Sequence, residues 1–189
     1  APGLFSGADL FALEYAADPQ VRPDGSAVAY TRVGFEIMSD RARRSIWLVD
    51  VKSGEQWPLA ASTGMSYGSP RWSPDGQRLA YVGTGEDGMP QLLVHWLAQR
   101  TTSRLTELTR PPGNLSWSPD GRWIAFTMLV PATPEPLGCA PPKPTGAQWA
   151  EPLQVFSEIQ YRSDDSGYLE AGHTQIFVVS AEGGAPRPL

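Results

Sequence analysis

The sequence is poor in the residues that build metal centres and disulfides. It contains two histidines and one cysteine, and its carboxylates follow no ligand spacing. This set predicts no metal site and no cofactor, and the single Cys139 excludes an internal disulfide. Cysteine content alone therefore leaves the cellular compartment open.

Long apolar runs and an excess of positive charge are lacking as well. No stretch approaches the roughly 18 apolar residues of a membrane span. The net charge of −5 argues against nucleic acid, which selects basic surfaces. We expect neither a membrane nor nucleic acid among the partners. The start at Ala1 without methionine favours a periplasmic or secreted protein, although a cytoplasmic location stays open.

Turn formers and large aromatic rings are abundant. The 189 residues include 19 glycines, 19 prolines and seven tryptophans, and 41% of the chain is hydrophobic. This composition is typical of many short strands packed sheet on sheet.

A tripeptide repeat organises the chain. Pro-Asp-Gly occurs three times, and its glycines Gly25, Gly76 and Gly121 are spaced by 51 and 45 residues. A short β-type run follows each copy, at residues 28–30, 79–81 and 124–126. Units of about 40–50 residues with four strands each are typical of propeller blades.

The second copy shows the four strands most clearly. Alternation and β-branched or aromatic content predict strands over 69–73, 78–82, 91–97 and 104–108. We therefore predict an all-β fold, a partial β-propeller of about three four-stranded antiparallel blades with a short N-terminal helix. The helix should cover about residues 8–15, because Ser6 and Asp9 form a capping box.

The predicted domains follow the repeat: a helix and lead-in at 1–17, and blades at 18–61, 62–109 and 110–189. Three blades do not close a ring, since propellers use about 4–8. We expect the chain to be the leading part of a longer protein. The alternative is that three blades are complete and that their open sheet faces self-associate.

The third blade carries a long insertion at about residues 129–173. Strand parity places it on the edge where the chain enters each blade, which we call the inlet edge, opposite the Pro-Asp-Gly turns. The segment 131–144 contains six prolines and predicts an extended arm. Long insertions of this kind are functional or disordered, and we favour a functional lid or contact arm.

Five side chains are candidates for contact with a substrate or another domain. Glu36, Arg43 and Arg44 lie in the inlet-edge loop of the first blade, and Arg162 and Tyr168 flank the return from the insertion. The simpler interpretations are a solvated loop for the first three and local packing for the other two.

One motif resembles a catalytic site. Residues 64–68 match G-x-S-x-G, whose serine normally stands on a turn between a strand and a helix. Here a repeat strand follows, so a link between blades is the better interpretation of Ser66. His95 lies in a repeat strand and His173 beside the insertion, without a spaced partner. The segment 164–167 reads as a plain turn rather than a cation loop. We predict no catalytic residue and no metal ligand.

Several passages resemble a known family. They are Asp-Pro-Gln-Val-x-Pro-Asp-Gly at 18–25, Trp-Ser-Pro-Asp-Gly at 72–76 and 117–121, and the segments 161–169, 175–179 and 183–189. Together they are similar to the N-terminal propeller of prolyl-oligopeptidase-family serine peptidases, in the acylaminoacyl-peptidase and dipeptidyl-peptidase-like branch. The Trp-Ser-Pro-Asp-Gly repeat is shared with TolB-type propellers. Arg22 departs from this repeat, which otherwise has serine there.

The resemblance implies a gating role. In that family a propeller of seven or eight blades caps a C-terminal α/β-hydrolase domain with a Ser-Asp-His triad, and restricts substrates to short or unstructured peptides. No residue of this chain matches the triad motif, so the segment is expected to be non-catalytic and to act on peptides through its parent enzyme. The alternative is a TolB-like scaffold that binds protein partners. Neither substrate specificity nor total blade number follows from the residues.

Overall fold

A computed structural model gives the fold and describes residues 6–84, 88–132, 138, 141–150, 156, 159–164 and 167–189. Cys139 and parts of the proline-rich segment lie outside these residues. Two compact units are present, one of Ala1–Met128 with Gln175–Leu189 and one of Leu129–Thr174.

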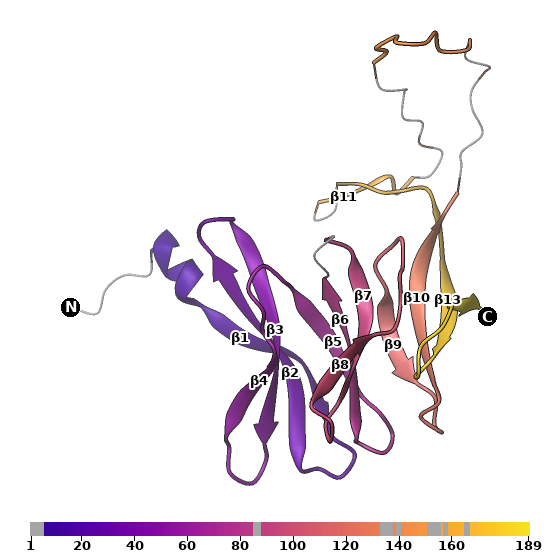
Figure 1. Cartoon of the computed structure of the whole chain (residues 1–189). Coiled ribbons are helices and arrows are strands. Elements are labelled where there is room, and N and C mark those ends of the chain that lie inside the picture. The colour runs from indigo at the N-terminus through magenta and orange to yellow at the C-terminus, as the bar shows by residue number, and fades with distance from the viewer. Residues whose placement is uncertain are drawn as a thin grey trace. The chain divides into compact units, whose positions relative to one another are not determined.

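The chain folds into three four-stranded antiparallel sheets (Figure 1). The first has the order β1-β2-β3-β4, the second β5-β6-β7-β8 and the third β14-β13-β10-β9, and β11 and β12 form a separate hairpin. The all-β prediction with three such sheets is confirmed. The bounds are η1 Gly7–Ala12, β1 Glu14–Val21, β2 Ala27–Glu36, β3 Arg41–Asp50, β4 Gln56–Ala60, β5 Tyr67–Trp72, β6 Arg78–Thr84, β7 Pro90–Trp96, β8 Thr101–Arg104, β9 Gly113–Trp117, β10 Trp123–Pro131, β11 Arg162–Ser163, β12 Gly167–Tyr168, β13 Gly172–Ser180 and β14 Arg187–Pro188.

The Pro-Asp-Gly turns join the first two strands of each sheet. In the second sheet the Asp75 carboxylate accepts a hydrogen bond from the Gln77 amide at 3.0 Å, and the Gly76 amide donates to the Ser73 carbonyl at 2.8 Å. Gly76 has φ +65, a left-handed value that costs a residue with a side chain about 1–2 kcal/mol. The repeated glycine is therefore a backbone requirement.

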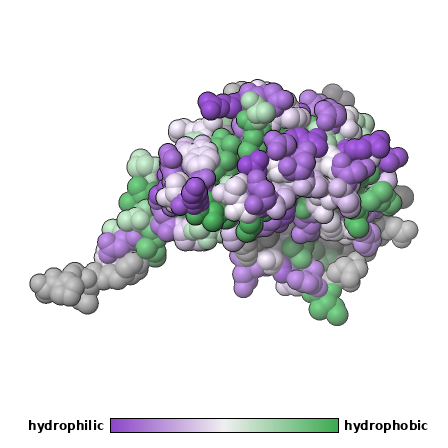
Figure 2. Space-filling view, turned by 90° about the horizontal axis from the view of Figure 1, so that it is seen from below, coloured by the Kyte–Doolittle hydropathy of each residue, from purple (hydrophilic) through white to green (hydrophobic). Residues whose placement is uncertain are grey.

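The space-filling view from this side of the molecule shows mostly hydrophilic residues, with hydrophobic ones scattered among them (Figure 2).

Two buried clusters join neighbouring sheets. Ile46 and Tyr81 belong to the cluster between the first and second sheets, and Ile124 and Val179 to the one between the second and third. These four side chains are at most 2% exposed. Burying one large apolar side chain contributes about 1.5–3 kcal/mol, so these clusters are the main cohesion between blades.

A tryptophan reaches back from each of the two later sheets. The Trp72 indole N–H donates to the Gln20 carbonyl of β1 at 2.9 Å, and the Trp117 indole N–H donates to the Arg71 carbonyl of β5 at 2.9 Å. Both bonds connect the first strands of consecutive sheets. The first sheet has Val21 at the equivalent position, and this side chain is exposed.

An arginine reaches forward in the opposite direction. Arg22 donates to the Gly76 carbonyl at 2.9 Å, and Arg78 donates to the Gly121 carbonyl at 2.7 Å. The Arg78 guanidinium also lies 4.9 Å from the centre of the Trp117 ring, within cation–π range. The unusual arginine at position 22 therefore binds the turn of the next sheet.

The N-terminal helix is shorter than predicted. η1 is a 3-10 helix that ends at Ala12, and Leu13 is already extended. β1 begins at Glu14, within the predicted lead-in, because Glu14 and Tyr15 pair with β2. Strand pairing therefore overrides the helical pattern at these two residues. The predicted cap is confirmed, since Asp9 accepts a hydrogen bond from the Ser6 amide at 2.6 Å.

The fourth strand of the second sheet was predicted at the wrong place. β8 covers Thr101–Arg104 rather than 104–108, because Arg100 adopts φ +52 and ends the preceding turn early. The Leu105 amide still donates to the Leu92 carbonyl at 2.8 Å, but Leu108 is held by a side chain instead of a strand ladder. The buried Gln91 amide group accepts from the Leu108 N–H at 2.7 Å and donates to the Leu108 carbonyl at 3.0 Å.

The second unit contains the third-sheet insertion. Its neck is closed by a hydrogen bond from the Ala132 amide to the Ala171 carbonyl at 2.8 Å. A Cβ at Gly172 would lie 2.4 Å from the Val130 carbonyl oxygen, so only glycine permits this approach. In chain order the insertion takes the place of the β2–β3 turn in the first sheet.

Candidate functional site

The β2–β3 hairpin brings three of the predicted contact residues onto one element. Glu36 ends β2 and accepts a hydrogen bond from the Ser39 hydroxyl at 2.6 Å. Arg43 and Arg44 lie in β3 rather than in the predicted loop, because they pair with Gly34 and Val33 of β2. As consecutive strand residues they point to opposite faces of the sheet. Arg43 is 3.9 Å from the Glu14 carboxylate, which Arg32 also contacts at 2.9 Å.

Exposed apolar residues surround this hairpin. Ile37 and Met38 at its tip are 63% and 89% exposed. Phe35 lies 6.4 Å from the ring of Tyr15, and both rings are partly exposed. Apolar side chains next to arginines are typical of interaction surfaces, where arginine and aromatic residues are enriched.

The insertion holds the other two predicted residues. Arg162 and Tyr168 are paired across the β11–β12 hairpin. Two further exposed rings gather beside Tyr168: Phe156 lies 5.2 Å from both Tyr161 and Tyr168, measured between ring centres. The packing interpretation of Tyr161 and Tyr168 accounts for these contacts, although each ring keeps an exposed face.

Ser66 lacks the setting of a catalytic nucleophile. β5 follows it directly, and no helix starts there. Its carbonyl accepts hydrogen bonds from the amide and hydroxyl of Thr84 at the end of β6, both at 2.9 Å. Ser66 lies between β4 and β5, so the segment connects two blades. His95 contacts the Thr102 hydroxyl at 2.9 Å, and burial lowers the pKa of this histidine. His173 is exposed at the start of β13.

The segment 164–167 forms the turn between β11 and β12 as far as it is described. Gly167 has φ +74, as a turn glycine should, and residues 165 and 166 lie outside the described part of the chain. Within the described residues, no group of three or more metal-binding side chains occurs.

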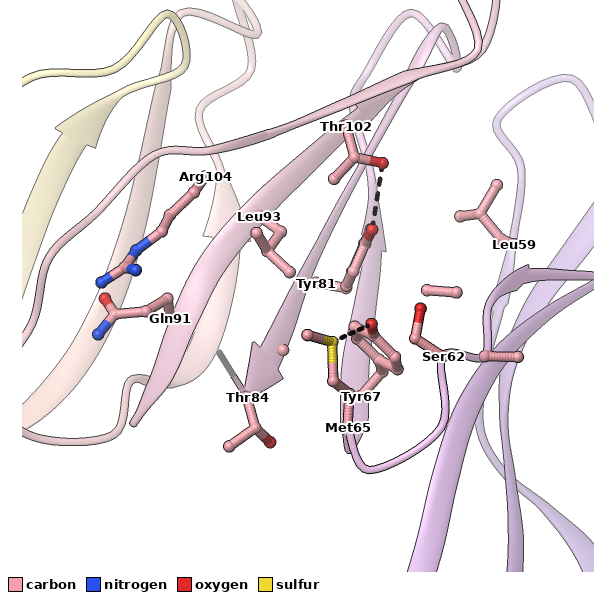
Figure 3. A pocket seen from close by; sticks show the side chains of 13 residues that line it. Leu59, Ser62, Met65, Tyr67, Tyr81, Thr84, Gln91, Leu93, Thr102 and Arg104 are labelled. Carbon is pink, nitrogen blue, oxygen red and sulfur yellow. Dashed lines mark hydrogen bonds between the residues drawn. The ribbon is translucent and has the colours of Figure 1, made fainter. Parts of the chain in front are cut away.

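A pocket between the first and second sheets was not foreseen. Its volume is about 340 Å³ (Figure 3). In this close-up Leu59 and Ser62 lie on one side, and Tyr67 and Tyr81 of the second sheet lie on the other. All these residues and the adjoining strand ends, including Thr84, line it. These strand ends lie at the inlet edge, since β5 begins and β6 ends there.

Hydroxyl groups at the pocket are satisfied locally. The Tyr67 hydroxyl donates to the Met65 sulfur at 2.9 Å, and the Tyr81 hydroxyl lies 3.4 Å from that of Thr102. Burial raises the pKa of Tyr81, so this hydroxyl stays neutral at ordinary pH. The lining therefore combines apolar side chains and the two tyrosine rings with the polar residues Ser62, Thr84, Gln91 and Thr102, and Arg104 is its charged member.

Comparison with known proteins places these features in a family. Residues 12–130 match the TolB beta propeller domain (PD40). The uncharacterized peptidase YuxL of Bacillus subtilis is 28% identical over 186 residues, covering 98% of this chain and 28% of that protein. The chain thus spans under a third of this relative's length.

Solved structures show the same fold. The acylaminoacyl peptidase of Pyrococcus horikoshii superposes with a TM-score of 0.71 at 17% identity, over 95% of this chain and 26% of that one. TolB from Acinetobacter baumannii gives a TM-score of 0.58 at 22% identity, over 93% of this chain and 32% of that one. Among the described residues, no helix has the length and hydrophobicity to cross a membrane. The three four-stranded sheets are therefore blades of a β-propeller, and the chain belongs to the TolB beta propeller domain family.

Proposed function

We propose that this chain is the gating part of a serine peptidase, with a hydrolase domain C-terminal to it that supplies the acyl-enzyme chemistry. The observation that carries the proposal is the similarity to a peptidase, YuxL, along 98% of the chain. The propeller would restrict which peptides reach the hydrolase, and no residue of this chain would take part in bond cleavage.

The inlet-edge residues give the proposal its candidate contacts. Glu36, Arg43 and Arg44 would contact the peptide or the hydrolase domain, and Arg162 and Tyr168 would do so from the insertion. Support comes from their exposure and from the apolar residues around them, such as Met38. A charged rim of this kind is expected to orient a bound chain rather than to supply most of the affinity.

The gating role is tested by removing the insertion from the full-length protein. The Ala132–Ala171 hydrogen bond already closes the neck, so an Asn-Gly turn can replace residues 133–170 without disturbing it. We expect short chromogenic peptides to be cleaved at an unchanged rate, while longer peptides and unfolded proteins become better substrates. Rates on peptides of graded length measure this.

A matched control keeps the insertion and removes only the candidate side chains. Arg162→Ala with Tyr168→Ala should change KM for longer peptides and leave turnover of a dipeptide substrate intact. Equal length profiles for all three proteins would contradict gating. Absence of peptidase activity and of fluorophosphonate labelling in the full-length protein would contradict the peptidase assignment itself.

The TolB-like scaffold is the second candidate, favoured by the domain match over residues 12–130. It predicts stable protein partners in pull-downs with the full-length protein and no peptidase activity. Self-association through the open blade faces, and a periplasmic or secreted location, also stay proposals. Light scattering over a range of concentrations tests the first, and fractionation of the native organism tests the second.

A further inference from the structure

One position of the repeat differs sharply among the three blades. Seven residues after the turn glycine, the first blade has Arg32, the third has Met128, and the second has Gly83. Met128 packs against the buried cluster between the second and third sheets. The second blade therefore lacks a long side chain at a place where both its neighbours have one.

The pocket adjoins this position. A Cβ on Gly83 would come within 2.4 Å of Leu93 Cδ1 and 2.8 Å of the Tyr67 ring. These two side chains close over the glycine and form part of the wall, and the remaining space of about 340 Å³ stays open. Gly83 is thus the residue that permits the shape of the pocket.

We propose that this interblade pocket is a subsite that binds one apolar side chain of an extended peptide. The proposal rests on the proposed function and assigns a specificity role to it. Ligand pockets start at about 300 Å³, so this volume is large enough to take one leucine or phenylalanine side chain of a bound peptide. Its place at the inlet edge puts it on the same edge as the exposed β2–β3 hairpin.

The chemistry of the lining selects against charged side chains. Tyr67 and Tyr81 are 7% and 2% exposed, and both hydroxyls already have partners. Entering this interior would remove water from a charged side chain, which is costly, so lysine, arginine and acidic side chains all gain little there. Arg104, the charged member of the lining, is exposed and donates to the Thr106 carbonyl at 2.8 Å. Leucine, phenylalanine and tyrosine remain as the favoured occupants.

The test uses amide-resolved NMR of the 189-residue chain with three probes: N-acetyl-phenylalaninamide, N-acetyl-leucinamide and N-acetyl-lysinamide. We expect the first two to shift the amide resonances of Ser62, Gly83 and Leu93 in a saturable manner, and the lysine probe to shift none of them. Equal shifts by all three probes, or shifts centred elsewhere, overturn the proposal.

Two variants locate the binding. Ser62→Trp places an indole at the exposed rim and should weaken binding of the phenylalanine probe at least tenfold. Gln99→Trp adds the same group to the exposed β7–β8 turn at the opposite edge and should bind like the parent. Unchanged binding by Ser62→Trp overturns the subsite.

A third variant, Gly83→Met, carries the residue of the third blade. It should also abolish binding of the phenylalanine probe if its amide spectrum shows that it is folded. If it is unfolded, the result for Ser62→Trp tests the subsite instead. Because these measurements involve no hydrolysis, they can fail while the peptidase assignment stands. A full-length protein without peptidase activity would instead remove the assignment and leave any side-chain binding in place.

Discussion

The two interfaces between blades use one set of contacts but are packed differently. Each has a tryptophan that reaches back to the previous blade and an arginine that reaches forward to the next turn. Between the second and third blades, Phe126 belongs to the buried cluster and Met128 packs against it. Between the first and second, the equivalent position is Gly83, and a pocket adjoins it. The repeat thus supplies the tryptophan attachment, while the two arginines come from non-equivalent positions and single residues decide how each interface is packed.

The largest expected effect contrasts the two cores. Ile124→Ala removes a fully buried side chain from the cluster between the second and third blades and should lower the free energy of unfolding by about 2–5 kcal/mol. Leu93→Ala, beside the existing pocket, should cost about 2 kcal/mol or less because its side chain is only partly buried. Urea unfolding followed by tryptophan fluorescence measures both. Equal losses would show that the pocket does not loosen its interface.

A smaller effect is expected from adding a Cβ at Gly83, between the first and second blades. Gly83→Ala should destabilise by about 1–3 kcal/mol, because the added Cβ meets Leu93 and Tyr67. Gly68→Ala is the matched control in the same sheet, since a Cβ there has open space and should change stability by less than about 0.5 kcal/mol. Thermal unfolding distinguishes them. A neutral Gly83→Ala would mean that the two side chains move aside easily.

The shared attachment should respond alike at both interfaces. Trp72→Phe and Trp117→Phe each remove one indole hydrogen bond to the previous blade, at a cost of about 0.5–1.5 kcal/mol. The two losses should agree closely in urea titrations. A clearly larger loss for one variant would show that the attachment is not equivalent in the two interfaces.

The smallest effect concerns pH and the turn that receives Arg22. Hydrogen bonds from the Ser73 hydroxyl and the Gln77 amide lower the pKa of the Asp75 carboxyl. The Asp75 carboxylate therefore contributes fully to the free energy of unfolding above its unfolded-state pKa of about 3.9. This contribution is lost as the pH falls through the lower pKa of the folded state. Asp75→Asn should flatten the acid limb of the stability profile between about pH 4 and 2. An unchanged acid limb would contradict this role.

The fold could be predicted in most of its outline, because each blade is specified locally. The Pro-Asp-Gly turns need particular residues at particular backbone angles, and the strands on either side alternate or are apolar. The predictions failed where distant groups compete with local preference. Glu14 and Tyr15 were predicted to be helical, but they pair with β2 and form strand. Leu108 was predicted to belong to a strand, but it is hydrogen-bonded to the Gln91 side chain instead.

The candidate site was only partly predictable. Glu36, Arg43 and Arg162 could be proposed because the segments between repeat strands are recognisable from spacing, although all three belong to strands in the structure. The pocket was missed, although alignment of the three repeats does reveal a glycine in place of arginine and methionine at position 83. That glycine could equally have marked a bulge or a close backbone approach, so the pattern did not say whether space was left.

The sequence by itself determined a tandem β-sheet architecture with turns at the Pro-Asp-Gly tripeptides, since these depend on neighbours along the chain. Only the tertiary structure decided which residues join the blades and where a pocket opens. Arg22, Trp72 and Gly83 act on groups that lie far from them in the sequence, and the space around Gly83 depends on how Tyr67 and Leu93 pack. Such packing is settled by side chains from several strands at once, and repeat spacing carries no record of it.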